Sequence, residues 1–214
     1  MALVIGVVSQ KGGVGKSTIA RLVACNYAAH DWQVKIADMD LSQGTCTSWN
    51  RRRLQNEIEP RVAVEQFASV QDALKQSLHY DLIVFDGAPH STSKTLDIAR
   101  HSHLVILPTG MALDDLEPTI KLAHELKKHK IPVEKIAIAL SRIGSSDVEL
   151  AEAIEYINQS GYYLLEGVIH EKTAIRRASD EGKCASETPF KTINEKVDVL
   201  VQSIVNRVEA IAVS

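Results

Sequence analysis

The stretch Gln10-Lys11-Gly12-Gly13-Val14-Gly15-Lys16-Ser17-Thr18 decides the fold. It joins an apolar run over residues 3–9 to a segment of helical period over residues 17–29, which is the setting of a phosphate-binding loop. Its glycines allow backbone angles that other residues avoid, so successive N–H groups can face one anion beside a helix N-terminus. Lys16 is expected to reach the β and γ phosphates of a nucleotide, and the Ser17 hydroxyl to hold Mg²⁺. The predicted nucleotide-binding residues here are Gly12, Gly13, Val14, Gly15, Lys16, Ser17 and Thr18. A glycine-rich turn without a ligand is the alternative.

Outside this stretch, short apolar runs alternate with segments of helical period. Strands are expected over residues 3–9, 34–38, 62–66, 82–86, 104–108, 136–141 and 163–168. Helices are expected over residues 17–29, 69–79, 92–100, 114–129, 147–160, 172–181 and 190–211. Several of the strands are apolar on both alternating sets of residues, as strands covered by helices on two faces should be. The pattern predicts a single α/β domain over residues 1–214, with a mainly parallel twisted sheet flanked by helices.

The composition excludes several classes of protein. With 214 residues, 45% hydrophobic and 24% charged, and with only 11 Gly and 6 Pro, the chain is not collagen-like, low-complexity or disordered. A net charge of -3 is not that of a general nucleic-acid binder, so DNA contact would need a local patch. The three cysteines are odd in number and far apart in the sequence (Cys25, Cys46 and Cys184). This pattern favours a reducing compartment over a set of disulfides. Without a signal peptide or a long apolar run, we expect a cytoplasmic protein with no membrane partner.

Two acidic sites end predicted strands. Asp38 and Asp40 follow the second run, where open α/β sheets bind ligands, and their spacing of two points both carboxylates to one side of an extended chain. Asp86 ends the apolar run over residues 82–86, as in a Walker B motif, and would hold Mg²⁺ through a water molecule. For the first pair, a turn that merely ends the strand is the alternative.

The residues Lys11-Gly-Gly-Val-Gly-Lys16-Ser resemble the deviant Walker A motif of the ParA/MinD ATPases, although Gln10 replaces the first glycine of the strict pattern. The resemblance implies ATP and Mg²⁺ as cofactors and a homodimer that forms with ATP, in which Lys11 contacts the partner's nucleotide. It implies catalytic roles for Lys11, Lys16 and Asp40. The implied metal-binding residues are Ser17, Asp40 and Asp86. After Asp40 the chain departs from the family, because Leu41-Ser42-Gln43 replaces the usual Pro-Gln.

Two further segments resemble parts of this family. Residues 87–93 look like its nucleotide-sensing switch, and His90 within them is expected to be solvated. Ser141 and Arg142 end the sixth predicted strand, where relatives contact adenine, although Ser141 replaces the common Asn or Thr. A surface turn is the alternative at that position.

Three basic clusters and one histidine pair need an interpretation. Residues 51–53 and 127–130 are expected to be solvated helix faces. Lys172, Arg176 and Arg177 lie where ParA relatives bind nonspecific DNA, and a few cations per subunit, doubled in a dimer, would suffice for phosphate contacts. His101 and His103 lack a third ligand nearby, so no metal site is expected there.

The resemblance favours a ParA-type ATPase for DNA partitioning. Such a protein coats the nucleoid and is released when a ParB-type partner stimulates its slow ATP hydrolysis. One alternative is a positioning ATPase for the division site, a carboxysome or a chemotaxis cluster. A Min-type membrane anchor needs a basic amphipathic tail, and residues 197–214 contain only Arg207 as a cation. Another alternative is an ATP-dependent ligase on the same scaffold.

Overall fold

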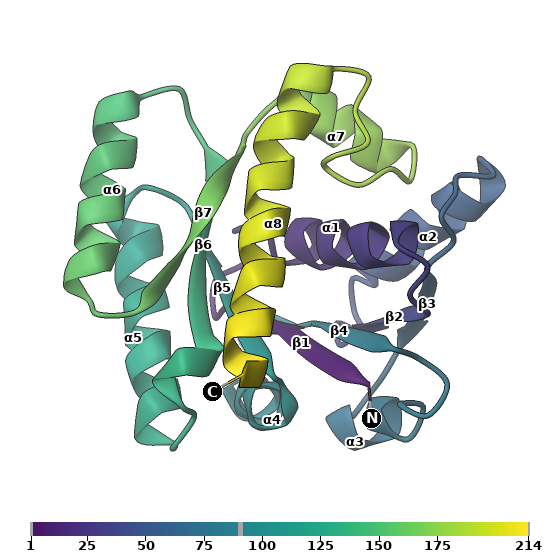
Figure 1. The fold of residues 1–214 in the computed structure, drawn as a ribbon, viewed down its shortest axis with the longest axis horizontal. Helices are drawn as coiled ribbons and strands as arrows, with labels where there is room; N and C mark the ends of the chain where they lie inside the picture. The colour runs from purple at the N-terminus through teal and green to yellow at the C-terminus, as the bar shows by residue number, and fades with distance from the viewer. Residues whose placement is uncertain (1, 90–91, 214) are drawn as a thin grey trace.

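The computed structural model describes residues 2–89 and 92–213, in which helices cover both faces of one seven-stranded sheet (Figure 1). The strands are β1 (Leu3–Val7), β2 (Val34–Asp38), β3 (Ala63–Gln66), β4 (Leu82–Asp86), β5 (Leu104–Thr109), β6 (Ile136–Ile143) and β7 (Tyr163–His170). The helices are α1 (Lys16–Ala29), α2 (Thr45–Gln55), α3 (Val70–Leu74), α4 (Thr92–His101), α5 (Leu113–Lys128), the 3-10 helix η1 (Val133–Lys135), α6 (Asp147–Gln159), α7 (Thr173–Asp180) and α8 (Lys191–Val213). The strand order is β3-β2-β4-β1-β5-β6-β7, and neighbouring strands are parallel. The predicted α/β class with a parallel sheet is confirmed.

The sheet separates two apolar cores. Ile5 of β1 packs in one core with side chains of α1, α2 and α8, and Val4 packs in the other with side chains of α3 to α6. Successive side chains of a strand point to opposite faces, so a strand with a core on each side needs apolar residues at every position. In Figure 1, α8 crosses in front of the sheet. Within residues 2–89 and 92–213, no helix combines the length and apolar character that crossing a bilayer requires.

The topology brings the ends of three strands together. Central strand β1 pairs with β4 on one side and β5 on the other, and β4 also pairs with β2. In these registers Asp86 is the partner of both Val7 and Asp38. Because parallel strands end at the same edge, the loop after β1 lies beside both acidic strand ends.

Several element boundaries differ from the sequence expectation. The helix expected over residues 69–79 is only α3, Val70–Leu74, followed by turns, although the Ser69 side chain caps its start by accepting from the Asp72 N–H. Strand β6 continues to Ile143 and β7 to His170, because their mutual pairing extends through bulges beyond the apolar runs. His90 lies outside the described residues, so its expected solvation stays a prediction.

Residues 51–53 lie on a helix as expected, but the extent of α2 (Thr45–Gln55) was not predicted. The structure also corrects the interpretation of this arginine run. Arg51 is exposed, but Arg53 is fully buried, so the expectation of a solvated face is wrong for Arg53. The Arg53 guanidinium donates to both carboxylate oxygens of Glu187, at 2.7 and 2.8 Å, and to the Gly182 carbonyl at 3.1 Å. These hydrogen bonds hold α2 against the segment between α7 and α8. The second run, residues 127–130, is exposed as expected.

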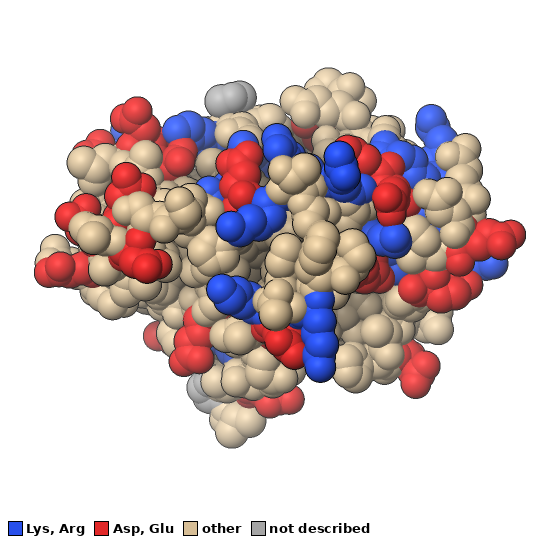
Figure 2. Space-filling model, turned by 90° about the horizontal axis from the view of Figure 1, so that it is seen from above, with Lys and Arg blue, Asp and Glu red and all other residues tan. Residues whose placement is uncertain are grey.

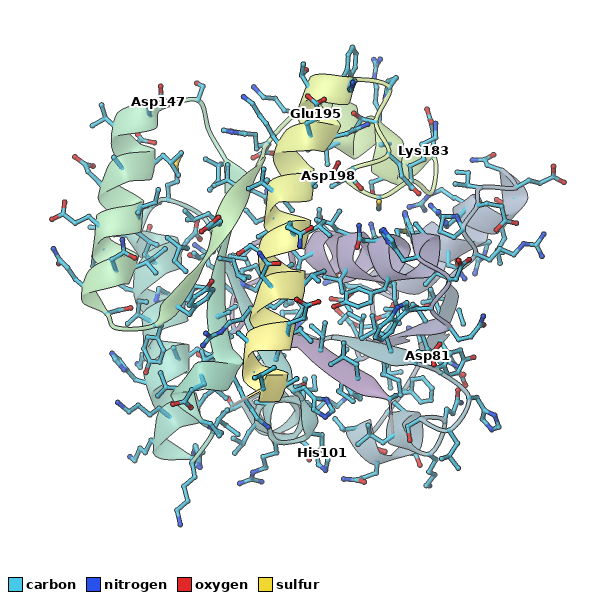
Figure 3. The ribbon with its side chains drawn as sticks, in the orientation of Figure 1. Asp81, His101, Asp147, Lys183, Glu195 and Asp198 are labelled. Carbon is cyan, nitrogen blue, oxygen red and sulfur yellow. The ribbon has the colours of Figure 1, made fainter. Side chains whose placement is uncertain are left out.

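The histidine pair forms no ligand set. His101 lies at the end of α4, and Figure 3 shows it on the opposite side of the molecule from Asp147 at the start of α6. The Nδ1 atom of His101 is 2.8 Å from the Asp97 carbonyl oxygen. His103 Nδ1 instead accepts from the Val4 N–H at 2.9 Å. The two rings therefore contact different backbone groups, and the absence of a metal at this pair stays a prediction.

Candidate nucleotide-binding site

The phosphate loop is built by two glycines in the left-handed region. Gly13 has φ of 80° and Gly15 has φ of 100°, which residues with a side chain adopt at a cost. A Cβ atom on Gly15 would also lie 2.3 Å from the Ser141 Oγ atom. The loop thus rests directly on the end of β6 and continues into α1 at Lys16.

The Lys16 side chain folds back onto the phosphate loop that precedes it. Its residue is only 7% exposed, and its Nζ donates to the Lys11 carbonyl at 3.0 Å. Burial lowers the pKa of Lys16, and the charges of Asp86 and Asp40 act in the opposite direction. A cation buried between a backbone carbonyl and two carboxylates is suited to neutralising a phosphate group.

Asp38 and Asp40 do different things, although the sequence suggested that both point to one side. Asp38 is fully buried, and its Oδ2 accepts from the N–H groups of Cys46 and Thr47, each at 3.1 Å. It therefore caps the start of α2, where backbone N–H groups have no partner within the helix. Asp40 instead lines the cavity described below.

The Asp40 carboxylate is fixed by its own loop. Its Oδ1 accepts from the Ser42 hydroxyl at 2.6 Å, the Ser42 N–H at 3.1 Å and the Gln43 N–H at 3.0 Å. Burial acts to raise the pKa of Asp40, but these hydrogen bonds outweigh it and hold the pKa below its ordinary value. Ser42 and Gln43, which depart from the family pattern, therefore orient Asp40 as an anion.

Replacing each aspartate should separate stability from function. We expect Asp38→Ala to lower the free energy of unfolding by roughly 2 kcal/mol, because a buried cap with several hydrogen bonds is lost. We expect Asp40→Ala to change it by less than about 0.5 kcal/mol, since this side chain bonds only within its loop. Urea unfolding of both variants measures the difference. Equal destabilisation by the two changes would contradict the assignment.

Asp86 offers a free ligand atom beside the loop. It is buried, and its Oδ2 accepts from Cys46 Sγ at 3.1 Å. Within the part of the chain that the structure describes, its Oδ1 has no hydrogen-bond partner. Burial raises the pKa of Asp86, while the nearby Ser17 and Cys46 side chains act in the opposite direction. A buried carboxylate oxygen without a partner is costly unless a ligand satisfies it. Oxygen atoms of Ser17, Asp40 and Asp86 are the donors that Mg²⁺ prefers, so this set fits the ion.

These residues meet in a cavity of about 350 Å³ at the carboxyl edge of the sheet. Every predicted nucleotide-binding residue lines it except Lys11 and Val14, and so do Ser17, Asp40 and Asp86 of the predicted metal set. Lys172 and Arg176, considered for DNA, also line this cavity, whereas Arg177 does not. The sequence reasoning missed Arg21, which lines it too and which its position four residues after Ser17 could have indicated.

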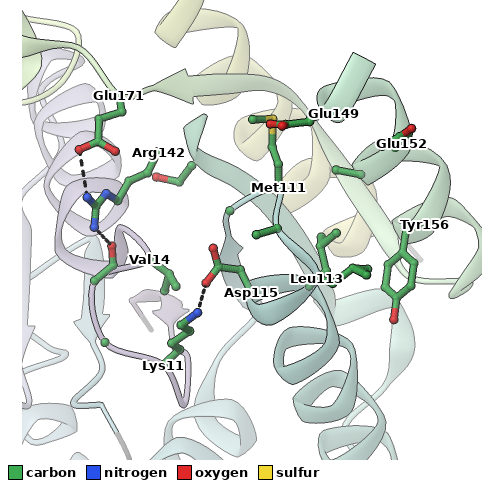
Figure 4. Close-up of a pocket in the computed structure, with 17 residues that line it drawn as sticks. Lys11, Val14, Met111, Leu113, Asp115, Arg142, Glu149, Glu152, Tyr156 and Glu171 are labelled. Atoms are coloured by element: carbon green, nitrogen blue, oxygen red, sulfur yellow. Dashed lines mark hydrogen bonds and ion pairs between the residues drawn. The ribbon is translucent and has the colours of Figure 1, made fainter. Parts of the chain in front are cut away.

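Lys11 lies on the other side of the phosphate loop, in a second cavity of about 800 Å³ (Figure 4). Its Nζ forms an ion pair with Asp115 at the start of α5 and donates to the Asp114 carbonyl at 3.1 Å. Val14 also lines this second cavity. The phosphate loop therefore forms a wall between two cavities, with Lys16 on one side and Lys11 on the other.

Ser141 and Arg142 support the loop from β6. Ser141 is fully buried against Gly15, and its hydroxyl has no hydrogen-bond partner among the described residues. Arg142 donates to the Gly13 carbonyl at 2.6 Å and to Glu171 at 3.0 Å, and both residues line the two cavities. They stand next to the phosphate loop, and contact with adenine stays a prediction.

The sequence matches a known family of nucleotide-binding domains. Residues 5–185 match the CobQ/CobB/MinD/ParA nucleotide binding domain. A curated relative, the maintenance of carboxysome distribution protein A of Gloeobacter kilaueensis, is 28% identical over 188 residues, which cover 84% of this chain and 82% of the relative.

Solved structures share the fold at low sequence identity. Apo McdA of Cyanothece has a TM-score of 0.74 at 14% identity, covering 95% of this chain and 100% of that one. A putative plasmid partition protein of Borrelia burgdorferi bound to AMPPNP has a TM-score of 0.71 at 18% identity, covering 97% and 100%. The ParA protein of pNOB8 bound to nonspecific DNA has a TM-score of 0.65 at 15% identity, covering 96% and 99%.

Proposed function

This chain belongs to the CobQ/CobB/MinD/ParA family of nucleotide-binding domains, and from that premise we propose that it is a ParA/MinD-type ATPase with ATP and Mg²⁺ as its ligands. The observation that carries the proposal is the cavity in which Lys16, Ser17, Asp40 and Asp86 meet. Structural neighbours with this fold include one bound to AMPPNP. The proposed reaction hydrolyses ATP to ADP and inorganic phosphate.

The roles of the side chains follow from their positions. The loop N–H groups and Lys16 would bind the phosphates, and Ser17 and Asp86 would hold Mg²⁺. When bound, Mg²⁺ neutralises charge on the phosphate oxygens. Asp40, fixed as an anion by Ser42 and Gln43, would orient the attacking water.

We also propose that ATP drives the formation of a homodimer in which Lys11 contacts the partner's nucleotide. In this structure Lys11 instead pairs with Asp115 of its own chain (Figure 4). To reach a partner, the Lys11 side chain must leave Asp115 and exchange one anion for another. A positive charge supplied across an interface would stabilise negative charge that develops on the transferred phosphoryl group, as an arginine finger does.

The DNA-binding part of the proposal rests on α7. Lys172, Arg176 and Arg177 are all exposed, and in Figure 2, which looks down on the side where α7 lies, Lys and Arg side chains gather over the middle of the face. Arg177 lies outside the nucleotide cavity, so it is the foremost candidate for phosphate contacts. The pNOB8 relative bound to nonspecific DNA supports this reading of the fold.

The cargo that such an ATPase would position is a plasmid, a chromosome region or a protein body. One structural neighbour is a plasmid partition protein and a curated relative maintains carboxysome distribution. We propose DNA partitioning with a ParB-type partner in a nucleoid-associated protein, with positioning of a protein body as the second candidate. Both use the same ATP-dependent dimer and differ in the partner that stimulates hydrolysis.

The proposal is tested by measuring ATP turnover of the purified chain alone, with nonspecific DNA, and with the product of the adjacent downstream gene. Joint stimulation by DNA and that partner is the expected result. DNA retention should require ATP and fall with salt, and Arg177→Ala should reduce the log–log salt slope of the dimer by about 2. Arg51→Ala, at an exposed arginine of α2, is the matched control. Phosphate release only with a small-molecule acceptor, indifferent to DNA, would instead identify a ligase.

A further inference from the structure

Arg21 connects the phosphate cavity to α7. It lies one helical turn after Ser17 on α1, is only 5% exposed, and lines the cavity beside Lys16. Its Nη2 donates to the Thr45 carbonyl at 2.6 Å, and its Nη1 donates to the Ser179 hydroxyl at 2.9 Å. One side chain therefore touches the cavity, the first residue of α2 and the last turn of α7.

The hydrogen-bond acceptors of this buried cation are neutral groups. The Thr45 carbonyl and Ser179 hydroxyl are neutral, and the Trp49 ring centroid is 5.4 Å from the guanidinium carbon. Among residues 2–89 and 92–213, the Nε of Arg21 has no hydrogen-bond partner. A buried charge without a hydrogen-bonded carboxylate is sensitive to charges nearby, because the protein interior screens them poorly. Negative phosphate groups in the adjoining cavity would stabilise Arg21 in this position.

Helix α7 borders the nucleotide cavity near its start and is hydrogen-bonded to α2 near its end. Near its start, Lys172 and Arg176 line the same cavity as Arg21. Near its end, Arg52 of α2 donates to the Ser179 carbonyl at 3.3 Å, and Trp49 donates to the Lys183 carbonyl at 3.0 Å. The bond from Arg21 to Ser179 is thus a link from the cavity to the far end of α7.

We propose that Arg21 is a positioning residue that transmits occupancy of the phosphate cavity to α7. Bound nucleotide fixes the Arg21 guanidinium, which then holds Ser179 and orders the last turn of α7 and the segment that follows it. This inference rests on the proposed binding of nucleotide. It adds the path by which binding would affect α7, the helix that carries Arg177. Through this route, nucleotide would prepare the surface proposed to bind DNA.

Hydrogen exchange of the full chain, with and without ATPγS and Mg²⁺, tests the link. In the wild type, nucleotide should slow exchange of amides in residues 176–187 by about tenfold. Ser179→Ala should reduce this slowing to less than about threefold, because the hydroxyl that receives the Arg21 bond is gone. Ser179 does not line the cavity, so affinity for a fluorescent ATP analogue should stay within about twofold of the wild type. Arg21→Lys, which keeps the charge but loses the fork of donors, should reproduce the effect on exchange.

Arg52→Ala is the matched control, because it removes a different hydrogen bond to the same residue from outside the cavity. It should speed exchange equally with and without nucleotide and leave the ratio unchanged. If Ser179→Ala retains the tenfold response of the wild type, α7 responds through Arg176 directly and the role of Arg21 is refuted. If the wild type does not bind the ATP analogue at all, the proposed function fails first and this inference with it.

Discussion

Lys16→Ala is expected to lower ATP affinity at least about 100-fold, because a buried ammonium that meets the phosphates contributes several charge-assisted interactions. Lys16 is almost fully buried and is anchored on the Lys11 carbonyl at 3.0 Å. The cation is therefore preorganised over the loop. Without bound ATP, the dimer should not form. Equilibrium binding of a fluorescent ATP analogue and sedimentation with ATP measure the two effects.

Lys11→Ala is the informative companion variant. Its side chain lies in the second cavity, paired with Asp115, so ATP affinity of the isolated chain should remain within a few-fold of the wild type. ATP-induced dimerisation should be lost, because the charge that crosses to the partner is missing. A dimer that forms with ATP in the Lys11→Ala variant would contradict the role proposed for this lysine. Unchanged ATP affinity in the Lys16→Ala variant would contradict the site itself.

Arg53→Ala is expected to lower the free energy of unfolding by roughly 3–5 kcal/mol, because it leaves Glu187 as an uncompensated charge in a partly enclosed site. The Arg53 side chain is fully buried, and it also donates to the carbonyls of Gly182 and Pro60. A melting temperature lower by roughly 10 °C should accompany this loss in a chain of this size. Thermal unfolding and urea titration are the measurements.

The pH dependence gives a second reading of the same pair. Burial acts to raise the pKa of Glu187, but the hydrogen bonds from Arg53 outweigh it and hold the pKa below its ordinary value of 4.5. The pair therefore stabilises the wild type above pH 4.5, and this stabilisation is lost as pH falls through the lowered pKa. In Arg53→Ala the destabilisation should shrink on acidification, because a protonated Glu187 carries no charge. Arg51→Ala, two residues away and exposed, should change stability by less than about 0.5 kcal/mol. Similar losses for Arg51 and Arg53 would refute the assignment.

The sheet was predictable because its strands are apolar on both faces. The runs at residues 34–38 and 82–86 match β2 and β4 residue for residue, because an aspartate, Asp38 or Asp86, marks the end of each apolar run. The phosphate loop was predictable for a different reason, because few other structures need glycines and a lysine at that spacing. The gathering of Lys16, Asp40 and Asp86 followed from the rule that parallel strands end at one edge.

Helix α2 could not be predicted by the same reasoning. Its inward residues are Cys46, Trp49, Asn50 and Arg53, which have helical spacing but include an amide and a guanidinium. A search for apolar periodicity passes over such a helix, because half of its buried face is polar. The carboxylate that compensates the buried charge of Arg53 belongs to Glu187, which is 134 residues away in the sequence. The different roles of Asp38 and Asp40 could not be predicted either, because Asp38 caps the start of α2 and that start was not predicted.

The strand order has a consequence for how the chain is made. Strand β1 precedes the other six described strands in the sequence, yet both of its neighbours, β4 and β5, are synthesised much later. At roughly 5–20 residues per second, the apolar segment of β1 and α1 waits on the order of ten seconds for a sheet to join. The walls that β6 and α7 add to the nucleotide cavity are synthesised later still. The cavity is therefore complete only late in synthesis, and the proposed nucleotide would stabilise the finished protein by mass action.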